Sequence, residues 1–155
     1  MKRHAGFSLI ELMIVVALIG ILVGLAAPFT STWTDSAQVR EAEGLLNQGI
    51  GRAKAIALRN RFGMIDSQAS ALLCLSQDNL LSLHEAASAG SEASCASPQT
   101  WSAQLPRRVA LQNDGADFDC LALDARALPL GKNGCSTSQS FALSAGKEHV
   151  DLKLH

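Results

Sequence analysis

The sequence contains no tyrosine, and aromatic residues make up only 5% of its 155 residues. It also lacks a strong charge of either sign, because 13 basic residues balance 14 acidic ones and the formal net charge is −1. This balance gives no electrostatic reason to expect a nucleic acid as the main partner. The length is sufficient for one domain with an appendage.

Catalytic motifs are also missing from the sequence. No serine lies in a G-x-S-x-G motif, and no glycine-rich phosphate-binding loop follows a predicted strand. His4 lies before the first apolar run, and His84, His149 and His155 lie at no metal-ligand spacing. We therefore expect no catalytic residue, no metal site and no cofactor. An exported enzyme on a membrane anchor would need a clustered polar site, which the sequence does not offer.

Three acidic residues lie close together in the segment "NDGADFD", namely Asp114, Asp117 and Asp119. Such a cluster invites comparison with a calcium loop. However, the segment lacks the ligand spacing of an EF-hand and its terminal glutamate. The pattern is more typical of a polar turn.

The longest apolar run lies near the N-terminus, from Phe7 to Ala27, and Glu11 is its one charged residue. The length of this run matches the roughly 20 residues that a bilayer-spanning helix needs. Lys2 and Arg3 precede the run, and the next charge along the chain is Asp35. By the positive-inside rule, the N-terminus is expected to stay cytoplasmic while the rest of the chain crosses the membrane.

Two ordinary interpretations of this run leave Glu11 unexplained. A cleaved secretory signal peptide would use the run as its apolar region, with "GLAAP" as a cleavage site. The run is longer than such regions usually are, and a carboxylate would interrupt it. A plain signal anchor would hold a lone carboxylate inside the membrane, which is costly without a partner.

A third interpretation accounts for all of these residues. The segment "GFSLIELMIVVALIGILVGLAAP" has a Gly at position 6, Phe7 after it, Glu11 four positions later and Pro28 at its end. This pattern resembles the class III leader of type IV pilins and type II secretion pseudopilins. The resemblance implies a leader at 1–6, cleaved between Gly6 and Phe7 by a prepilin peptidase. It also implies N-methylation of the new Phe7 amine.

The resemblance also implies a role for Glu11. In the family's filaments, the apolar helices leave the bilayer and form a bundle in the filament core. Glu11 would face the positively charged Phe7 amine of a neighbouring subunit there, where a low dielectric strengthens the attraction and the pair can specify register. The alternative is a carboxylate that reaches toward the lipid headgroups and has no further role.

Four cysteines, at positions 74, 95, 120 and 135, all follow the apolar run, and none forms a Cys-x-x-Cys motif. An even number of widely spaced cysteines behind an export-like segment indicates disulfides in an oxidising compartment. Of the three pairings that four cysteines allow, we favour Cys74–Cys95 and Cys120–Cys135, because near neighbours close the shortest loops. The alternative is four free thiols in a cytosolic protein.

The rest of the chain predicts a helix followed by a β domain. Pro28 lacks an amide hydrogen and is expected to kink or interrupt the helix. An amphipathic continuation at 28–61 is expected next. Its apolar or small residues recur at steps of three and four, at Val39, Ala42, Leu46, Gly49, Ile50, Ala53 and Ile56/Ala57.

Alternating apolar residues predict several strands in the remaining segment, 62–155. A hairpin around Gln77 and Asp78 is expected, followed by a surface loop at 86–100. Further expected strands cover 108–112, 118–123, 140–144 and the C-terminal segment, in which Val150, Leu152 and Leu154 point inward. The expected fold is therefore α+β: a long N-terminal helix, membrane-spanning at 7–27, packed against a small antiparallel β domain in the periplasm.

The end of the amphipathic helix indicates which class within the family the chain resembles. The segment "LLNQGIGRAKAIALRNRFG" resembles the helix end of the GspH/FimT class, although Arg52 and Ala53 are inverted against that pattern. Ala55, Ile56, Arg59 and Asn60 stand in roughly the expected places, and "FDCLALDARALPLGKNGC" resembles that class more loosely. The resemblance implies a minor pilin or pseudopilin that initiates or caps a type IV pilus or a type II secretion pseudopilus. Its implied partners are other pilins in the inner membrane and then in the filament.

An alternative within the same class is a tip subunit that binds DNA during natural transformation. Some FimT-like members use basic residues of a C-terminal tail for this purpose. The tail here has Lys147 and Lys153, but Glu148 and Asp151 cancel their formal charge. Arg107 and Arg108 are the other candidate phosphate contacts, although an adjacent pair of this kind is more often a solvated loop.

Overall fold

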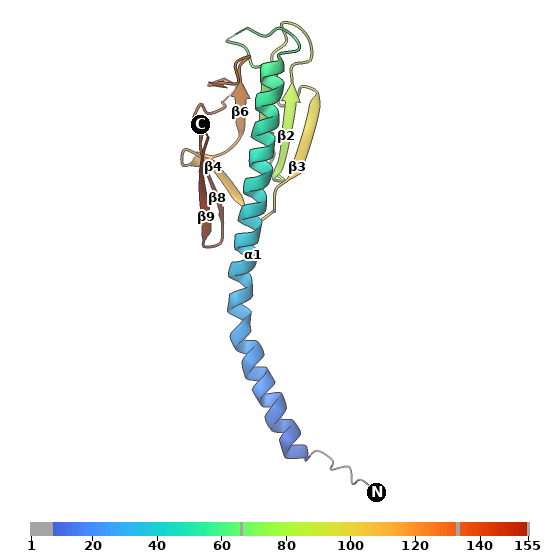
Figure 1. Ribbon diagram of the computed structural model, residues 1–155, viewed down its shortest axis with the longest axis vertical. Helices are drawn as coiled ribbons and strands as arrows, with labels where there is room; N and C mark the ends of the chain where they lie inside the picture. Colours follow the sequence, from blue (N-terminus) through green and yellow to red (C-terminus); the bar gives the residue numbers. More distant parts are fainter. Residues whose placement is uncertain (1–7, 66, 133, 155) are drawn as a thin grey trace. The chain divides into compact units, whose positions relative to one another are not determined.

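The computed structural model describes residues 8–65, 67–132 and 134–154, with no side chain described for residues 25–31 (Figure 1). Within these described ranges, a single long helix, α1 (Leu9–Arg59), is followed by nine short strands. The chain divides into two compact units, one ending at Thr34 and the other beginning at Asp35. Because α1 packs against antiparallel sheets in the second unit, the predicted α+β class is confirmed.

α1 continues through Pro28 as one helix, so the expectation of an interruption there is wrong, while the alternative expectation of a kink stays a prediction. A proline inside a helix removes the hydrogen bond that its own amide would have donated, and its ring crowds the carbonyl four residues earlier. The residues on both sides keep the helical conformation here, so this local loss does not end the element.

The C-terminal part of α1 buries the predicted apolar stripe. Its fully buried members lie at steps of three and four residues: Val39, Ala42, Leu46, Ile50, Ala53 and Ala57. The helix ends at Arg59, and the next residue, Asn60, adopts a left-handed φ of 40°. Its side-chain amide donates to the Met64 carbonyl at 2.9 Å and its side-chain oxygen accepts from the Met64 amide at 2.7 Å, which turns the chain toward the sheet.

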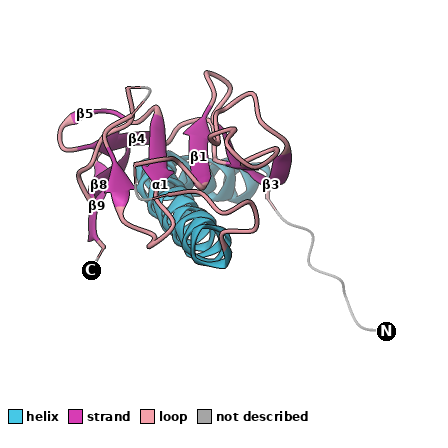
Figure 2. Cartoon of the chain, turned by 90° about the horizontal axis from the view of Figure 1, so that it is seen from above, coloured by secondary structure: helices cyan, strands magenta, loops and turns pink. Residues whose placement is uncertain are grey.

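Two antiparallel sheets form the rest of the second unit. The five-stranded sheet has the order β3-β2-β1-β6-β7, and the four-stranded sheet has the order β5-β4-β8-β9. The strands of the first are β1 (Ala71–Leu75), β2 (Leu80–Glu85), β3 (Gln99–Gln104), β6 (Cys120–Leu123) and β7 (Pro129–Leu130). The strands of the second are β4 (Ala110–Asn113), β5 (Ala116–Asp117), β8 (Ser140–Ala145) and β9 (Glu148–Lys153). Strands of both sheets lie along one side of α1 (Figure 2).

The predicted strands are present, and the structure adds three more. β5 and β7 contain two residues each. β3 falls partly within the segment that was expected to be a surface loop at 86–100, so that boundary is wrong. Residues 88–98 do form turns and loops, but Gln99 and Thr100 already belong to a strand that pairs with β2.

The main core lies between α1 and both sheets. Gly49 permits a close approach of the helix to the first sheet, because a Cβ at this position would lie 3.0 Å from the Trp101 ring and 3.2 Å from Leu81. Phe141 on β8 is among the largest fully buried side chains, and its ring meets Phe118 edge to face with centroids 5.7 Å apart. As expected, Val150, Leu152 and Leu154 pack against this core while His149 and Lys153 are exposed.

A second apolar cluster covers the opposite face of the first sheet. It contains Ala69, Leu72, Cys74, Ala93, Cys120, Ala122 and Cys135. Along β1, Ala71 and Leu73 belong to the core facing α1, whereas Leu72 and Cys74 belong to this outer cluster. Strands that are covered on both faces read as continuous apolar runs, which explains why "ALLCL" does not alternate.

Candidate functional site at the helix N-terminus

Ser8 and Glu11 form a reciprocal cap at the start of α1. The Ser8 hydroxyl oxygen accepts from the Ile10 amide at 3.3 Å, and a Glu11 carboxylate oxygen accepts from the Ser8 amide at 3.0 Å. This arrangement is a capping box, in which the first residue and the residue three positions later each satisfy a backbone amide of the first turn. The carboxylate also lies where the helix dipole favours negative charge.

The capping box places the Glu11 carboxylate one residue from the expected cleavage site. Gly6 and Phe7 lie outside the described residues, so their predicted cleavage and methylation remain predictions. The Glu11 carboxylate accepts a hydrogen bond from the Ser8 amide. This amide belongs to the peptide bond that joins Phe7 to Ser8. The Glu11 carboxylate is therefore held at the end of the helix that directly follows residue 7 in the sequence.

The intramolecular role of Glu11 was not among the sequence-based expectations. The signal was available, because "SLIE" matches the S-x-x-E signature that often precedes an apolar helix. Glu11 therefore has two separable properties. One of its oxygens caps the helix by accepting a hydrogen bond, which the side-chain amide oxygen of a glutamine could also do. Its negative charge is the property that would attract an amine of a neighbouring subunit.

The first unit exposes an apolar helix surface. The large exposed hydrophobic residues among its described side chains include Leu9, Ile10, Leu12, Met13, Ile14, Val15, Val16, Leu18, Ile19, Ile21, Leu22 and Val23. None of these side chains belongs to either apolar cluster of the second unit. Over the residues that the structure describes, no helix has the length and apolar character needed to cross a membrane.

Two disulfides connect the first sheet to the loops that cover its outer face. Cys74 is bonded to Cys95 and Cys120 to Cys135, which is the near-neighbour pairing. The two strand cysteines, Cys74 and Cys120, are direct cross-strand partners on β1 and β6. Near them, the Lys132 ammonium pairs with the Glu92 carboxylate at 2.6 Å and so joins the two covering loops.

We expect the second disulfide to contribute substantially to stability. Replacing both Cys120 and Cys135 by serine should lower the free energy of unfolding by about 3 kcal/mol, because the bridge closes a loop with a sequence separation of 15. Urea unfolding of the purified full-length chain under non-reducing conditions measures this change. A variant as stable as the parent would show that the loop is ordered without its bridge.

Asp124 organises the hairpin between β6 and β7. Its carboxylate is almost fully buried, and one oxygen accepts from the Arg126 and Leu128 amides at 2.8 Å each. The Arg126 guanidinium donates to the other oxygen at 3.2 Å. Burial by itself raises the pKa of Asp124, but the two amides and the guanidinium together outweigh it and lower the pKa below its ordinary value.

This lowered pKa predicts a pH-dependent contribution to stability. The contribution of a carboxylate with a depressed folded pKa is fully present above its unfolded pKa, about 3.9, and is lost as the pH falls through the folded value. Asp124→Asn should therefore destabilise the fold by about 2 kcal/mol at neutral pH. The difference in the free energy of unfolding between the variant and the parent should narrow once the pH drops below the unfolded pKa. Unfolding curves of both proteins from neutral to strongly acidic pH test this, and a gap that is independent of pH would contradict it.

The four basic residues proposed as DNA contacts lie in different settings. The Arg108 guanidinium pairs with the buried Asp35 carboxylate on α1 at 3.2 Å. Arg107 lines an open cavity of about 600 Å³ together with Gln77, Asp78, Asn79 and Gln104. Lys147 lies in the turn between β8 and β9, whereas Lys153 lies at the far end of β9, opposite Ser140.

The acidic segment after β4 forms the polar turn that its sequence predicts. Asp114 and Gly115 have φ values of 53° and 80° and connect β4 to β5 as a two-residue hairpin loop. Positive φ at both positions is typical of a type I′ turn, for which Asp-Gly is a favoured pair. Throughout the described ranges, no group of three or more His, Cys, Asp or Glu side chains is placed to hold a metal ion.

Comparison with known proteins agrees with the N-terminal pattern. Residues 1–27 match the family model described as the prokaryotic N-terminal methylation motif. Two fimbrial proteins of Pseudomonas aeruginosa are each 55% identical to the chain over 42 residues, which is 27% of this chain and 27% of each relative. No solved structure matches the chain significantly. The chain therefore carries the prokaryotic N-terminal methylation motif in residues 1–27 and is similar to fimbrial proteins over about a quarter of its length.

Proposed function

We propose that this chain is a minor structural subunit that initiates or caps a type IV pilus or a type II secretion pseudopilus. The observation that carries this proposal is the contrast between the two parts of α1. Up to Val23, the described helix side chains are exposed and mostly apolar, whereas beyond Asp35 the helix is packed against two sheets. The first part is thus free to enter a membrane or a bundle of helices.

Several features support the membrane stage of this function. The matched methylation motif covers the apolar run, which carries one charge between residues 7 and 27. The two disulfides suit a β domain in an oxidising compartment such as the periplasm. In the proposed sequence of events, a prepilin peptidase cleaves after Gly6, Phe7 is methylated, and the subunit waits in the inner membrane until it joins other pilins.

Glu11 is the proposed assembly residue. Its carboxylate caps its own helix in the isolated subunit. In a filament core with a low dielectric, the same carboxylate would attract the Phe7 amine of a neighbouring subunit far more strongly than it would in water.

A clean deletion of the gene tests whether the subunit serves a type IV pilus or a type II secretion pseudopilus. Surface pili per cell should fall in the deletion strain and recover on complementation if the subunit serves a type IV pilus. Unchanged pili with impaired protein secretion would instead identify the type II machine. If both processes were normal, the proposed assembly role would fail. Quantitative immunoblots of sheared filaments should show far less of this chain than of the major subunit.

The DNA-binding alternative predicts a different behaviour. Counterion release requires several unpaired cations along one surface, but Lys153 lies at the opposite end of β9 from Lys147 and Arg108 already has a carboxylate partner. We therefore expect no salt-sensitive mobility shift when the full-length protein in detergent is titrated with duplex DNA. A shift that weakens steeply with salt and is lost in Arg107→Ala would favour the alternative.

A further inference from the structure

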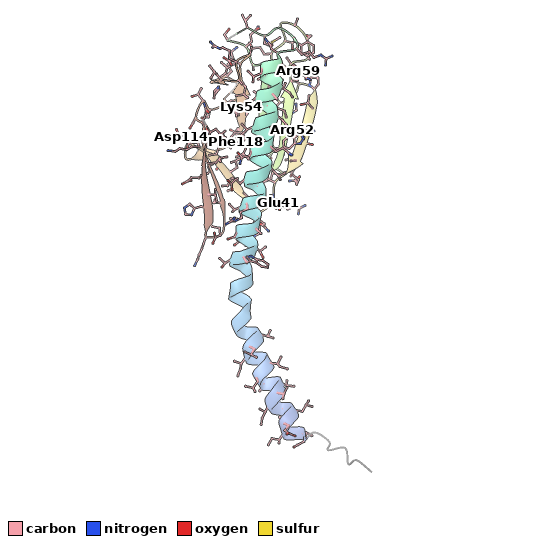
Figure 3. All side chains as sticks on the ribbon, viewed as in Figure 1. Glu41, Arg52, Lys54, Arg59, Asp114 and Phe118 are labelled. Carbon is pink, nitrogen blue, oxygen red and sulfur yellow. A yellow bond between two sulfur atoms is a disulfide. The ribbon has the colours of Figure 1, made fainter. Side chains whose placement is uncertain are left out.

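Trp33 is an isolated exposed aromatic side chain on α1. It is 80% exposed, and between Val23 and Leu58 it is the one large exposed hydrophobic residue among the helix side chains that the structure describes. The other tryptophan, Trp101 on β3, is half-buried and packs against the core. The guanidinium carbon of Arg52, which lies on α1 (Figure 3), is 5.6 Å from the Trp101 ring centroid. Trp33, by contrast, belongs to neither apolar cluster of the described residues.

The position of Trp33 coincides with a change in the polarity of the chain. Four hydroxyl residues, Thr30, Ser31, Thr32 and Thr34, surround it in the sequence. The first charge beyond Glu11 is Asp35, which is buried in the second unit. The stretch between Pro28 and Thr34 is therefore uncharged but polar, which is the composition expected where a helix leaves a hydrocarbon layer.

The geometry of a helix places the indole at a defined depth. Trp33 lies six residues beyond Ala27, the last residue of the apolar run, which is about 9 Å along the axis of an α-helix. Helical side chains lean toward the N-terminus, so the ring covers the preceding turn rather than its own. The headgroup layer on each side of a bilayer is about 5–7 Å thick. The ring therefore coincides with that layer when the apolar run fills the hydrocarbon core.

We propose that Trp33 is an interfacial anchor that binds the lipid headgroup layer on the periplasmic side and sets the depth of the waiting subunit. The inference rests on the proposed function, because it requires the apolar run to be inserted in a membrane. Tryptophan suits this layer because its ring is apolar and its indole N–H donates a hydrogen bond to a polar partner.

Depth-dependent fluorescence quenching tests the anchor. The full-length chain carrying Trp101→Phe has Trp33 as its single tryptophan and is reconstituted in vesicles of phosphatidylethanolamine and phosphatidylglycerol. We expect a blue-shifted emission and about twofold stronger quenching by lipids brominated near the headgroup than by lipids brominated near the chain terminus. The matched control, Trp33→Phe with Trp101 retained, should respond to neither lipid.

Separate measurements distinguish failure of the anchor from failure of the proposed function. Resistance of the chain to alkaline extraction from the vesicles reports membrane insertion independently of where Trp33 lies. If the chain is inserted but Trp33 is quenched by aqueous iodide and by neither brominated lipid, the anchor is refuted while the membrane stage stands. A Trp33 that becomes shielded only in assembled filaments would likewise refute it and assign the ring to a protein neighbour. If the chain is extracted, both proposals fail.

Discussion

Replacing Glu11 by glutamine is expected to remove this subunit from filaments while its β domain remains folded. Glutamine can occupy the third position of a capping box, so the hydrogen bond to the Ser8 amide is retained. The negative charge is lost, and a neighbour's Phe7 amine would then be buried without a counter-ion. Removing one partner of a buried ion pair costs about 3–5 kcal/mol, which corresponds to a loss in incorporation of roughly 100-fold or more.

The measurement is the fraction of the chain found in sheared filaments relative to the membrane pool, determined by immunoblotting. Glu41→Gln provides a matched control, because Glu41 is an exposed carboxylate on the same helix within the second unit (Figure 3). Glu11→Ala removes both the charge and the cap, so its difference from Glu11→Gln isolates the contribution of capping. Incorporation of Glu11→Gln at the parental level would refute the assembly role of the charge.

The second large effect is expected at Gly146, in the turn between β8 and β9. This glycine has a φ of 60°, and a Cβ at its position would collide with the Asp35 carboxylate. Asp35 cannot move away freely, because it is buried and paired with Arg108. Gly146→Ala therefore combines left-handed backbone strain with a steric clash, and it should destabilise the chain by about 3 kcal/mol.

Gly63→Ala separates these two causes. Gly63 has a similar φ of 65°, but nothing lies within 4 Å of the position that its Cβ would occupy. It should therefore cost only the backbone strain, about 1 kcal/mol. Urea unfolding of the full-length proteins in detergent, followed by Trp101 fluorescence, provides the comparison. Equal losses in the two variants would show that Asp35 does not constrain the turn.

Elements that bury one regular face could be predicted from the sequence. The stripe from Val39 to Ala57 follows a helical period, and β8 and β9 alternate as half-buried strands do. β3 could not be found in this way. Its sequence, "QTWSAQ", is polar and largely exposed, and it forms a strand because its backbone pairs with β2 at the edge of the sheet. β5 and β7 likewise depend on a partner strand.

The candidate site also contains features that could be predicted from the sequence and features that could not. The Ser8–Glu11 cap spans four residues and is readable from "SLIE", although the resemblance to pilins drew attention only to an intermolecular role for the carboxylate. The basic residues are a different case, because their spacing along the chain gave no sign that Arg108 would pair with a carboxylate on α1. A prediction of DNA contacts from charge alone could not include that neutralising partner.

The sequence by itself determined the features that depend on neighbours along the chain. These are the methylation segment, the apolar run with its single carboxylate, the helical stripe and the alternating strands, since each rests on local spacing. Only the tertiary structure decided which distant residues meet. It placed Cys74 opposite Cys120 across two strands, and it brought Asp35 against both Arg108 and Gly146. Such contacts follow from strand order and helix packing, which arise from the burial of the whole apolar core rather than from any one segment.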